Sequence, residues 1–341
     1  MPEHRQLLPG LVALISALAS IPVVLAHHGT FTFDGDTVIT LEGHIVRFNW
    51  TNPHGSVVLG VPQADGSIRE YFLEADGPSI LGPLGVSRDS LLPGDQVLAY
   101  VSPGRDPDAR SVLGREILKT DGTVVGLSVA YTRKLERENQ PVASSVIGTW
   151  VPDQRALFSF VQSRDNWPLT EAGAQSLASY DILAPFTQTE CIAATSPTVL
   201  MYPTAKVLTD NGSSLTLNAD WMGAVRTVYM DGRAHPQPAE TSLQGHSIGH
   251  LEDGILVIDT TGFSDNPIGN IFGIASGPLK HLVERLALAA DGRSLDYSFT
   301  LEDSTYLQAP VSGSYTWLYR PDVVASTERC DVEVASRHLT E

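Results

Sequence analysis

The sequence is poor in basic residues, and this shortage excludes a class of partners. It contains 22 Lys and Arg against 39 Asp and Glu, which gives a formal net charge of −17 at pH 7. Phosphates of nucleic acids are bound by clustered Lys and Arg, and no basic run occurs in the chain. We therefore expect no nucleic-acid partner. With 42% hydrophobic and 18% charged residues, the composition is that of a folded globular protein.

Cysteine is also scarce, since Cys191 and Cys330 are the only two in 341 residues. They do not form a C-x-x-C pair, so that type of metal or redox motif is absent. In an exported protein, an even number of cysteines favours a disulfide. We predict a Cys191–Cys330 bridge that ties the start of the second half of the chain to its last predicted strand.

The N-terminus has the pattern of an export signal. A short segment, MPEHRQ, precedes an apolar run that ends in Val24-Leu25-Ala26, a pattern suited to cleavage before His27. The alternative is an uncleaved membrane anchor over residues 7–26, about as long as a bilayer-spanning helix requires. We expect residues 1–26 to be a signal peptide and the protein to be periplasmic or secreted. Contact with the membrane is expected only if residues 7–26 stay attached.

Alternating apolar and polar residues, broken by turns, predict an all-β protein in two parts. In residues 27–132 the predicted strands are 37–49, 56–61, 68–74, 96–101, 112–119 and 123–127. They suggest a small OB-like barrel, with a short helical turn at 79–85. Residues 133–146 are polar and charged and are interpreted as a linker.

Residues 147–341 are predicted to form a larger antiparallel barrel. Its strands are expected at 198–208, 213–220, 224–231, 246–251, 254–262, 281–290, 294–302, 313–320 and 327–334. Gly148 and Trp150 are similar to the Gly-x-Trp that begins lipocalin barrels, so we expect a lipocalin-like barrel that can hold one small apolar ligand. Thr170 is predicted to cap a helix over 171–180.

The two adjacent histidines beside the cleavage site are candidate metal ligands. If cleavage frees the α-amine of His27, this amine and the imidazoles of His27 and His28 can chelate a copper or zinc ion. His54, or His44 on the strand before it, would supply a third nitrogen. The alternative is that both N-terminal histidines are merely solvated and that Asn52-Pro53 beside His54 only makes a turn.

Three segments resemble an exported bacterial family of unknown function, DUF6152. They are AHHGTFTFD, LEGHIVRFNWTNPHGSVVLGV and RDSLLPGDQV, which together span about residues 26–130. Gly29 and Gly55 stand where serine is usual in that family. The second half, through VYMDGRAHP and GHSIGHLEDGILVIDTTGF, is similar to a region of uncharacterised exported proteins. The resemblance implies export and no particular reaction.

One short motif suggests a serine hydrolase, but its context argues against that function. Gly245 to Gly249 matches G-x-S-x-G around Ser247, and Asp259 and His281 follow in the order Ser, Asp, His. A nucleophile elbow needs a helix after the serine, whereas a hairpin is predicted here. We therefore interpret the motif as part of a strand with small residues.

Polar residues predicted to point into the larger barrel form a second candidate site. A barrel mouth with His, Asp, Arg and Tyr can carry out acid–base chemistry on a bound ligand. The alternative is an Asp–Arg pair that only holds a loop. Candidate catalytic residues are Asp231, Arg233, His246 and His281, and candidate ligand contacts are Tyr229, His235, His250 and Glu284.

Three functions remain open from the sequence. The first is an exported binding protein that holds copper or zinc at His27, His28 and His54, a small apolar ligand in the second barrel, or both. The second is an enzyme without a cofactor, an isomerase, lyase or hydrolase that acts on a hydrophobic molecule; it requires a deep pocket where the candidate residues converge. The third is an accessory subunit of a membrane complex, tethered through residues 7–26.

Overall fold

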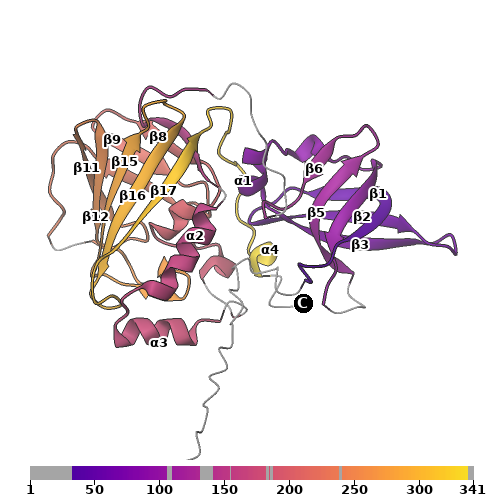
Figure 1. Cartoon of the computed structure of the whole chain (residues 1–341), viewed down its shortest axis with the longest axis horizontal. Coiled ribbons are helices and arrows are strands. Elements are labelled where there is room, and N and C mark those ends of the chain that lie inside the picture. Colours follow the sequence, from indigo (N-terminus) through magenta and orange to yellow (C-terminus); the bar gives the residue numbers. More distant parts are fainter. Residues whose placement is uncertain are drawn as a thin grey trace, which may run out of the picture.

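The computed structural model describes residues 33–105, 110–130, 141–153, 155–181, 184, 187–237 and 240–336. Two β-barrels lie side by side, with the C-terminal segment running between them (Figure 1). The fold is therefore all-β in the two parts that the sequence predicts. The proposed signal peptide, His27, His28 and most of the proposed linker lie outside the described residues.

The first barrel is built from five strands and extended by a sixth. The strands are β1 (Ile39–Asn49), β2 (His54–Pro62), β3 (Ile68–Asp76), β4 (Gln96–Ser102), β5 (Ser111–Lys119) and β6 (Val124–Gly126). Neighbours pair antiparallel in the order β3-β2-β1-β4-β5-β6, and a parallel pairing of β3 with β5 closes the barrel. Alternate apolar residues such as Ile45, Leu59 and Leu73 are fully buried inside it. All six predicted strands are confirmed.

Short helical turns connect β3 to β4, where the sequence predicts one. They are α1 (Pro78–Leu81), η2 (Gly82–Leu84) and η3 (Arg88–Ser90). Pro78 lies in the first turn of α1, where its missing N–H costs no hydrogen bond. All four residues of α1 are buried, and the helix lies on the side of this barrel that faces the second barrel (Figure 1).

The second barrel is closed by nine strands. They are β7 (Gly148–Pro152), β8 (Lys206–Asp210), β9 (Ser214–Asn218), β10 (Val225–Tyr229), β11 (His246–Glu252), β12 (Ile255–Thr261), β15 (Lys280–Leu288), β16 (Ser294–Asp303) and β17 (Val311–Tyr319). The order around the barrel is β10-β11-β12-β15-β16-β17-β7-β8-β9. The prediction of an antiparallel barrel fails at one pair, because β10 and β11 run parallel. The long segment between Tyr229 and His246 makes a crossover here instead of a hairpin.

The second half also contains helices and a short hairpin outside the nine barrel strands. They are α2 (Ala156–Ser163), η4 (Arg164–Asn166), α3 (Glu171–Ser179), η5 (Thr187–Glu190), η6 (Thr198–Met201), and the hairpin of β13 (Asn266–Ile271) and β14 (Ile274–Ser276). Helices α2 and α3 lie toward one end of the barrel (Figure 1). The predicted α3 is confirmed, and the Thr170 hydroxyl caps it by accepting the Gly173 N–H at 3.1 Å. The sequence analysis missed α2, which buries Phe160 against the ring of Phe299.

One predicted strand of the second half begins too early, and another is wrong. The segment predicted as strand 198–208 begins as η6, and β8 starts only at Lys206. The segment 327–334 is not a barrel strand, since β17 already closes the barrel against β7. Its last part forms α4 (Val332–Ser336) instead. Apolar runs this short carry no periodicity that separates a strand from a helical turn.

The junction between the barrels is held by the end of the chain and by Asn52. Asn52 is 7% exposed, and its amide nitrogen donates to the Ser79 hydroxyl at 3.1 Å and to the Glu328 carbonyl at 2.9 Å. The backbone carbonyl of Asn52 accepts the Asp331 N–H at 2.8 Å. Cys191 and Cys330 form the predicted disulfide across 139 residues. The bridge therefore ties the second barrel to a segment that also contacts the first.

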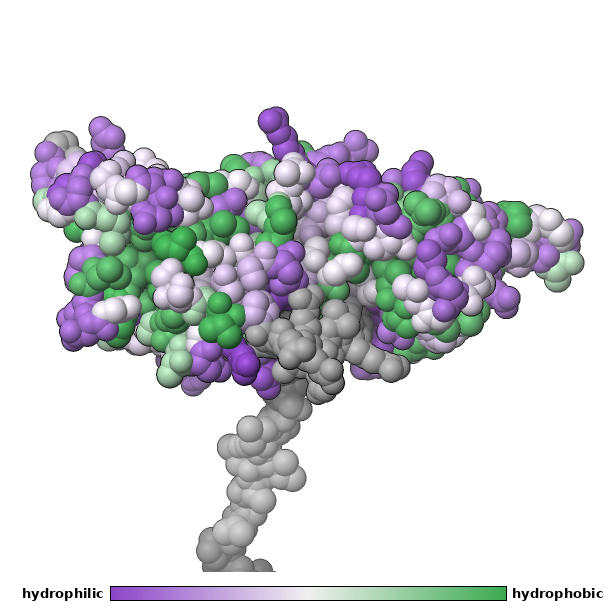
Figure 2. Space-filling view, turned by 90° about the horizontal axis from the view of Figure 1, so that it is seen from above, coloured by the Kyte–Doolittle hydropathy of each residue, from purple (hydrophilic) through white to green (hydrophobic). Residues whose placement is uncertain are grey.

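The surface shows no single large apolar face in the view of Figure 2. Hydrophobic residues gather mainly over the C-terminal barrel and are surrounded by hydrophilic ones. Exposed large apolar side chains occur on both barrels and include Ile68, Leu92, Leu251 and Leu279. Among the described residues, no helix is both long and apolar enough to cross a membrane.

Candidate functional site

The strand register divides the polar residues of the second barrel into two groups. Along β15, Lys280, Leu282, Glu284 and Leu286 are buried, while His281, Val283 and Arg285 between them are only partly buried. Successive side chains of a strand point to opposite faces. Glu284 therefore points into the barrel, and His281 points outward. The same alternation places Arg226 of β10 inside and Tyr229 outside.

The inner group is centred on a buried ion pair. Arg226 Nη1 lies 2.6 Å from Glu284 Oε2, and the two side chains are 3% and 0% exposed. Tyr297 donates its hydroxyl to Glu284 Oε1 at 2.9 Å. Burial, followed by the neighbouring Glu284 carboxylate, raises the pKa of Tyr297, so the phenol keeps the proton that it donates. Thr260 Oγ1 accepts a further bond from Arg226 Nη1 at 3.2 Å.

Part of the Arg226 guanidinium has no protein partner. Its Nε and Nη2 atoms are buried and make no hydrogen bond within the described structure, and the same is true of Trp317 Nε1. The Trp317 ring is stacked on that of Tyr297, with centroids 4.8 Å apart. Nε and Nη2 lie on one edge of the planar guanidinium and point the same way. The barrel interior thus contains unused hydrogen-bond donors in an otherwise packed core.

A second buried cation lies near this pair. Lys280 Nζ donates to Thr195 Oγ1 at 2.6 Å and to the Gly269 carbonyl at 2.8 Å. Burial lowers the pKa of Lys280 to about 7, although Asp303 and Glu284 act in the opposite direction. Asp303 itself accepts hydrogen bonds from the Asn270 amide at 3.0 Å and from a backbone N–H. Around the ion pair, the interior therefore contains two carboxylates, one permanent cation and one lysine that titrates near neutrality.

The outer group is a row of three imidazoles and two carboxylates, which we call the histidine row. It runs across the outer face of the barrel in the order His246, His235, Asp259, His281 and Glu302. The successive contacts are 2.9 Å between the Nδ1 atoms of His246 and His235, 3.2 Å from His235 Nε2 to Asp259 Oδ1, 3.0 Å from Asp259 Oδ1 to His281 Nε2, and 3.4 Å from His281 Nδ1 to Glu302 Oε2. His235 comes from the crossover segment, and the others come from β11, β12, β15 and β16.

The hydrogen bonds of the row determine the tautomer of His246. The Asp259 carboxylate only accepts, so His235 must carry a proton on Nε2, and Nδ1 of neutral His235 is then an acceptor. His246 must therefore donate from Nδ1, which leaves the lone pair of its Nε2 free. Burial, then His235 and Arg233, lower the pKa of His246, so it stays neutral at pH 7.

Tyr229, Asp231 and Arg233 lie at the His246 end of the row. The Tyr229 ring is stacked on His246, with centroids 5.1 Å apart, and the Arg233 guanidinium lies 3.8 Å from the Tyr229 centroid. The Arg233 guanidinium donates from Nε and Nη2 to both carboxylate oxygens of Asp231, and these bonds lower the pKa of Asp231 to about 2. Asp231 and Arg233 are exposed and neutralise each other. This matches the simpler alternative of an Asp–Arg pair that holds a loop.

The prediction that these polar residues line the barrel interior is wrong for most of them. Tyr229, His235, His246 and His281 lie on the outer face, where they are partly exposed, and His250 is exposed on the same face outside the row. Of the eight candidates only Glu284 points inward. The prediction failed because the face that each strand turns to the core depends on the register of its neighbours.

Two important residues were missed by the sequence analysis. Arg226 shares a strand face with the buried Val228, so the alternation contained the signal of a charge on an apolar face. Asp259 was noticed only as part of the hydrolase pattern. That pattern does not assemble, because Ser247 points into the barrel and bonds Thr260 at 2.8 Å, whereas Asp259 and His281 lie outside.

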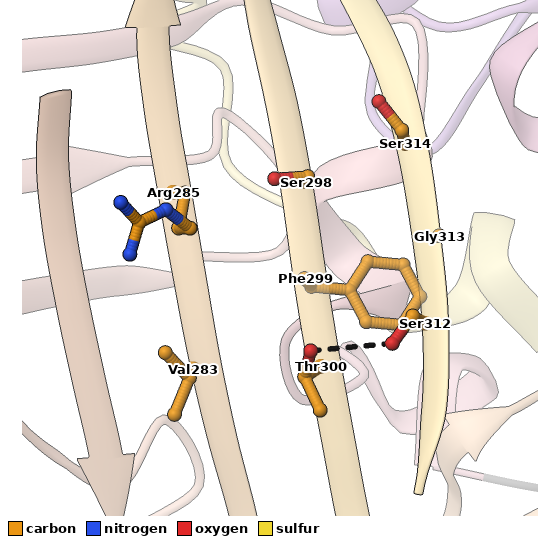
Figure 3. A pocket seen from close by; sticks show the side chains of 8 residues that line it. All are labelled: Val283, Arg285, Ser298, Phe299, Thr300, Ser312, Gly313 and Ser314. Carbon is orange, nitrogen blue, oxygen red and sulfur yellow. Dashed lines mark hydrogen bonds between the residues drawn. The ribbon is translucent and has the colours of Figure 1, made fainter.

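A shallow groove of about 440 Å³ lies beside the row on strands β15 to β17. Figure 3 shows hydroxyl side chains from neighbouring strands along it, including Ser298, Thr300 and Ser312, with Arg285 at one side. Thr300 and Ser312 are within hydrogen-bond distance of each other, at 3.2 Å. Gly313 leaves room for the Phe299 ring, because a Cβ there would lie 2.7 Å from Phe299 Cε1.

Nothing in the described part of the structure supports the predicted metal site. His27 and His28 lie outside the described residues, so their role stays a prediction. His54 begins β2 and lies 3.9 Å from a Glu74 carboxylate oxygen, between Nδ1 and Oε1. Throughout the described ranges, no group of three or more His, Cys, Asp or Glu side chains is arranged to hold a metal ion.

The comparison with protein families finds a match for the first part of the chain. Residues 15–113 match the model of the family of unknown function DUF6152. The match covers the first barrel up to β5 and the Asn52 motif at the junction, and it leaves the nine-stranded barrel unassigned. No curated protein and no solved structure matches the chain. The nine-stranded barrel confirms the predicted barrel, and its likeness to lipocalins stays a prediction.

Proposed function

We propose that this chain is an exported binding protein whose second barrel holds a small molecule against Arg226 and Trp317. The observation that carries the proposal is the free edge of the buried Arg226 guanidinium. A buried donor without an acceptor costs about 1–3 kcal/mol, and more when it is charged. A ligand oxygen that fills the edge offsets this cost. A barrel of about eight strands is wide enough for one small ligand.

The polar groups of the barrel interior change the kind of ligand that we expect, which the sequence alone predicted to be apolar. Large buried rings, among them Trp150, Tyr297 and Trp317, offer apolar contact. Arg226 and Trp317 offer hydrogen-bond donors only. The ligand we propose therefore has an apolar body and at least one oxygen acceptor. Copper or zinc binding through His27, His28 and His54 stays a separate prediction.

Native mass spectrometry of the exported protein tests this proposal. We expect one small molecule per chain, which denaturation releases. Trp317→Phe keeps an aromatic ring but removes the indole N–H together with part of the ring system, so it should weaken retention at least about 5-fold, as loss of one hydrogen bond of about 1 kcal/mol implies. Arg285→Met, on the outer face of β15, is the matched control and should retain the ligand. A bare chain, together with a crystal structure that has only water at Arg226, would refute the proposal.

Acid–base catalysis at the histidine row is the second candidate function. It is favoured by the free Nε2 lone pair of His246, whose tautomer is set by His235 and Asp259. The residues of the row do not converge in a deep pocket, which the enzyme hypothesis required. Hydrolysis of p-nitrophenyl acetate tests the base: we expect a His246→Phe variant to lose the histidine-dependent rate and a His250→Gln control to keep it. Equal rates in wild type and His246→Phe exclude this role.

A further inference from the structure

The charges inside the second barrel limit which oxygen can face Arg226. The free edge of the guanidinium, Nε and Nη2, has the geometry that binds both oxygens of a carboxylate side by side. The same edge also suits a single carbonyl oxygen, which has two lone pairs. Geometry therefore allows an anion or a neutral group, and electrostatics must decide between them.

The positive charge of Arg226 is already neutralised. Its Nη1 atom lies 2.6 Å from the Glu284 carboxylate, and both side chains are almost fully buried. A carboxylate ligand would be a second anion on one guanidinium, and its desolvation would be compensated only in part. It would also lie close to the Glu284 carboxylate, since both would contact the same planar group.

The other buried charges do not change this balance. Asp303 adds a second carboxylate to the interior, bonded to Asn270 and to the Gly277 N–H. Lys280 is the only other cation near the pair within the described residues, and its Nζ already donates to Thr195 Oγ1 and to the Gly269 carbonyl. Because burial brings the pKa of Lys280 to about 7, its charge is only partly present at neutral pH. The net charge of these four groups, Arg226, Glu284, Asp303 and Lys280, lies between about zero and minus one.

We propose that the ligand presents a neutral carbonyl oxygen, and not a carboxylate, to the Nε and Nη2 edge of Arg226. This inference rests on the proposed function and names the chemical class of its ligand: an apolar molecule with a ketone or related carbonyl group. Trp317 Nε1, another buried donor without a protein partner, likewise needs only a neutral acceptor.

A matched pair of probes tests the inference on the exported full-length chain. The probes are 2-dodecanone and dodecanoate, which share an apolar chain and differ in the head group, and binding is measured at pH 8 by quenching of tryptophan fluorescence. We expect wild type to bind the ketone at least 10-fold more tightly than the carboxylate. Glu284→Gln removes one negative charge and keeps the shape, so it should reverse this preference. Glu252→Gln, on the outer face, is the control and should leave the ratio unchanged.

The outcomes separate this inference from the proposed function. Tighter binding of dodecanoate by wild type, or an unchanged ratio in Glu284→Gln, overturns the inference alone. Binding of neither probe, while native mass spectrometry still finds a retained molecule, also overturns it and leaves the proposed function in place. A bare chain in the mass spectrum removes the proposed function itself.

Discussion

Replacement of Asn52 by Ala is expected to weaken the junction between the two barrels. The Asn52 amide nitrogen donates to the Ser79 hydroxyl at 3.1 Å and to the Glu328 carbonyl at 2.9 Å, and its Oδ1 accepts the Ser79 N–H at 3.3 Å. Asn52 lies in the segment that matches the DUF6152 model. The motif that suggested a metal ligand at His54 therefore has a visible structural role at the residue two positions earlier.

The magnitude follows from these contacts. Each hydrogen bond contributes about 1 kcal/mol net, and buried groups left without a partner add about 1–3 kcal/mol. Asn52 is only 7% exposed, so water does not easily replace its amide. We expect Asn52→Ala to lower the free energy of unfolding by about 2–4 kcal/mol. Urea unfolding followed by tryptophan fluorescence measures this change.

Ser79 also reaches the second barrel, because its hydroxyl donates to Asp220 Oδ1 at 3.3 Å, so a double-mutant cycle with Ser79→Ala shows whether this junction network is responsible. We expect a coupling energy of about 0.5–3 kcal/mol between Asn52 and Ser79, as for residues in one hydrogen-bond network. Asn49→Ala is the matched control, because Asn49 bonds Ser56 at 2.8 Å within the first barrel and does not reach the junction. A loss below about 1 kcal/mol, or additive effects of the Asn52 and Ser79 changes, would refute the reasoning.

Three further predictions follow from other parts of the structure. Reduction of Cys191–Cys330 removes a link across 139 residues, and we expect a loss of about 2–5 kcal/mol of stability in thermal unfolding; an unchanged Tm would contradict this. Burial raises the pKa of Asp220 to about 6 from its ordinary 3.8, so ionisation of this carboxyl lowers the stability of the folded state as pH rises through that range. The Asp220→Asn variant should therefore be more stable than wild type by up to about 3 kcal/mol at pH 7, with little difference at pH 4. Gly313→Ala places a Cβ 2.7 Å from the Phe299 ring and should cost about 1–3 kcal/mol in urea unfolding, whereas an unaffected midpoint would show that the ring has room to move.

Much of the architecture was predictable because local patterns determine it. Alternation gave all six strands of the first barrel and most strands of the second, and Thr170 marked the start of α3. These features depend on residues close together in the chain. Helix α2 and the helical start of the segment 198–208 were missed, because short apolar runs suit a strand as well as a helical turn.

The candidate sites were predicted less well, because they depend on which side of each strand faces the core. A strand of alternating residues has two faces, and its pairing register decides which one is buried. The residues of the histidine row were nearly all noticed as chemistry-bearing, but they were assigned to the wrong side of the barrel wall. The ion pair of Arg226 and Glu284 joins strands 58 residues apart in sequence, and nothing local connects the two residues.

The sequence by itself determined the two-part β composition, the acidic net charge, the disulfide partners and the similarity of the first part to DUF6152. Only the tertiary structure decided the inside and outside of the second barrel, the parallel pairing of β10 with β11, and the contact of Asn52 with the chain's end. The physical reason is that periodicity and composition act over a few residues. Barrel closure, in contrast, brings together strands from both ends of the second half and buries an arginine with two donors that have no protein partner among the described residues.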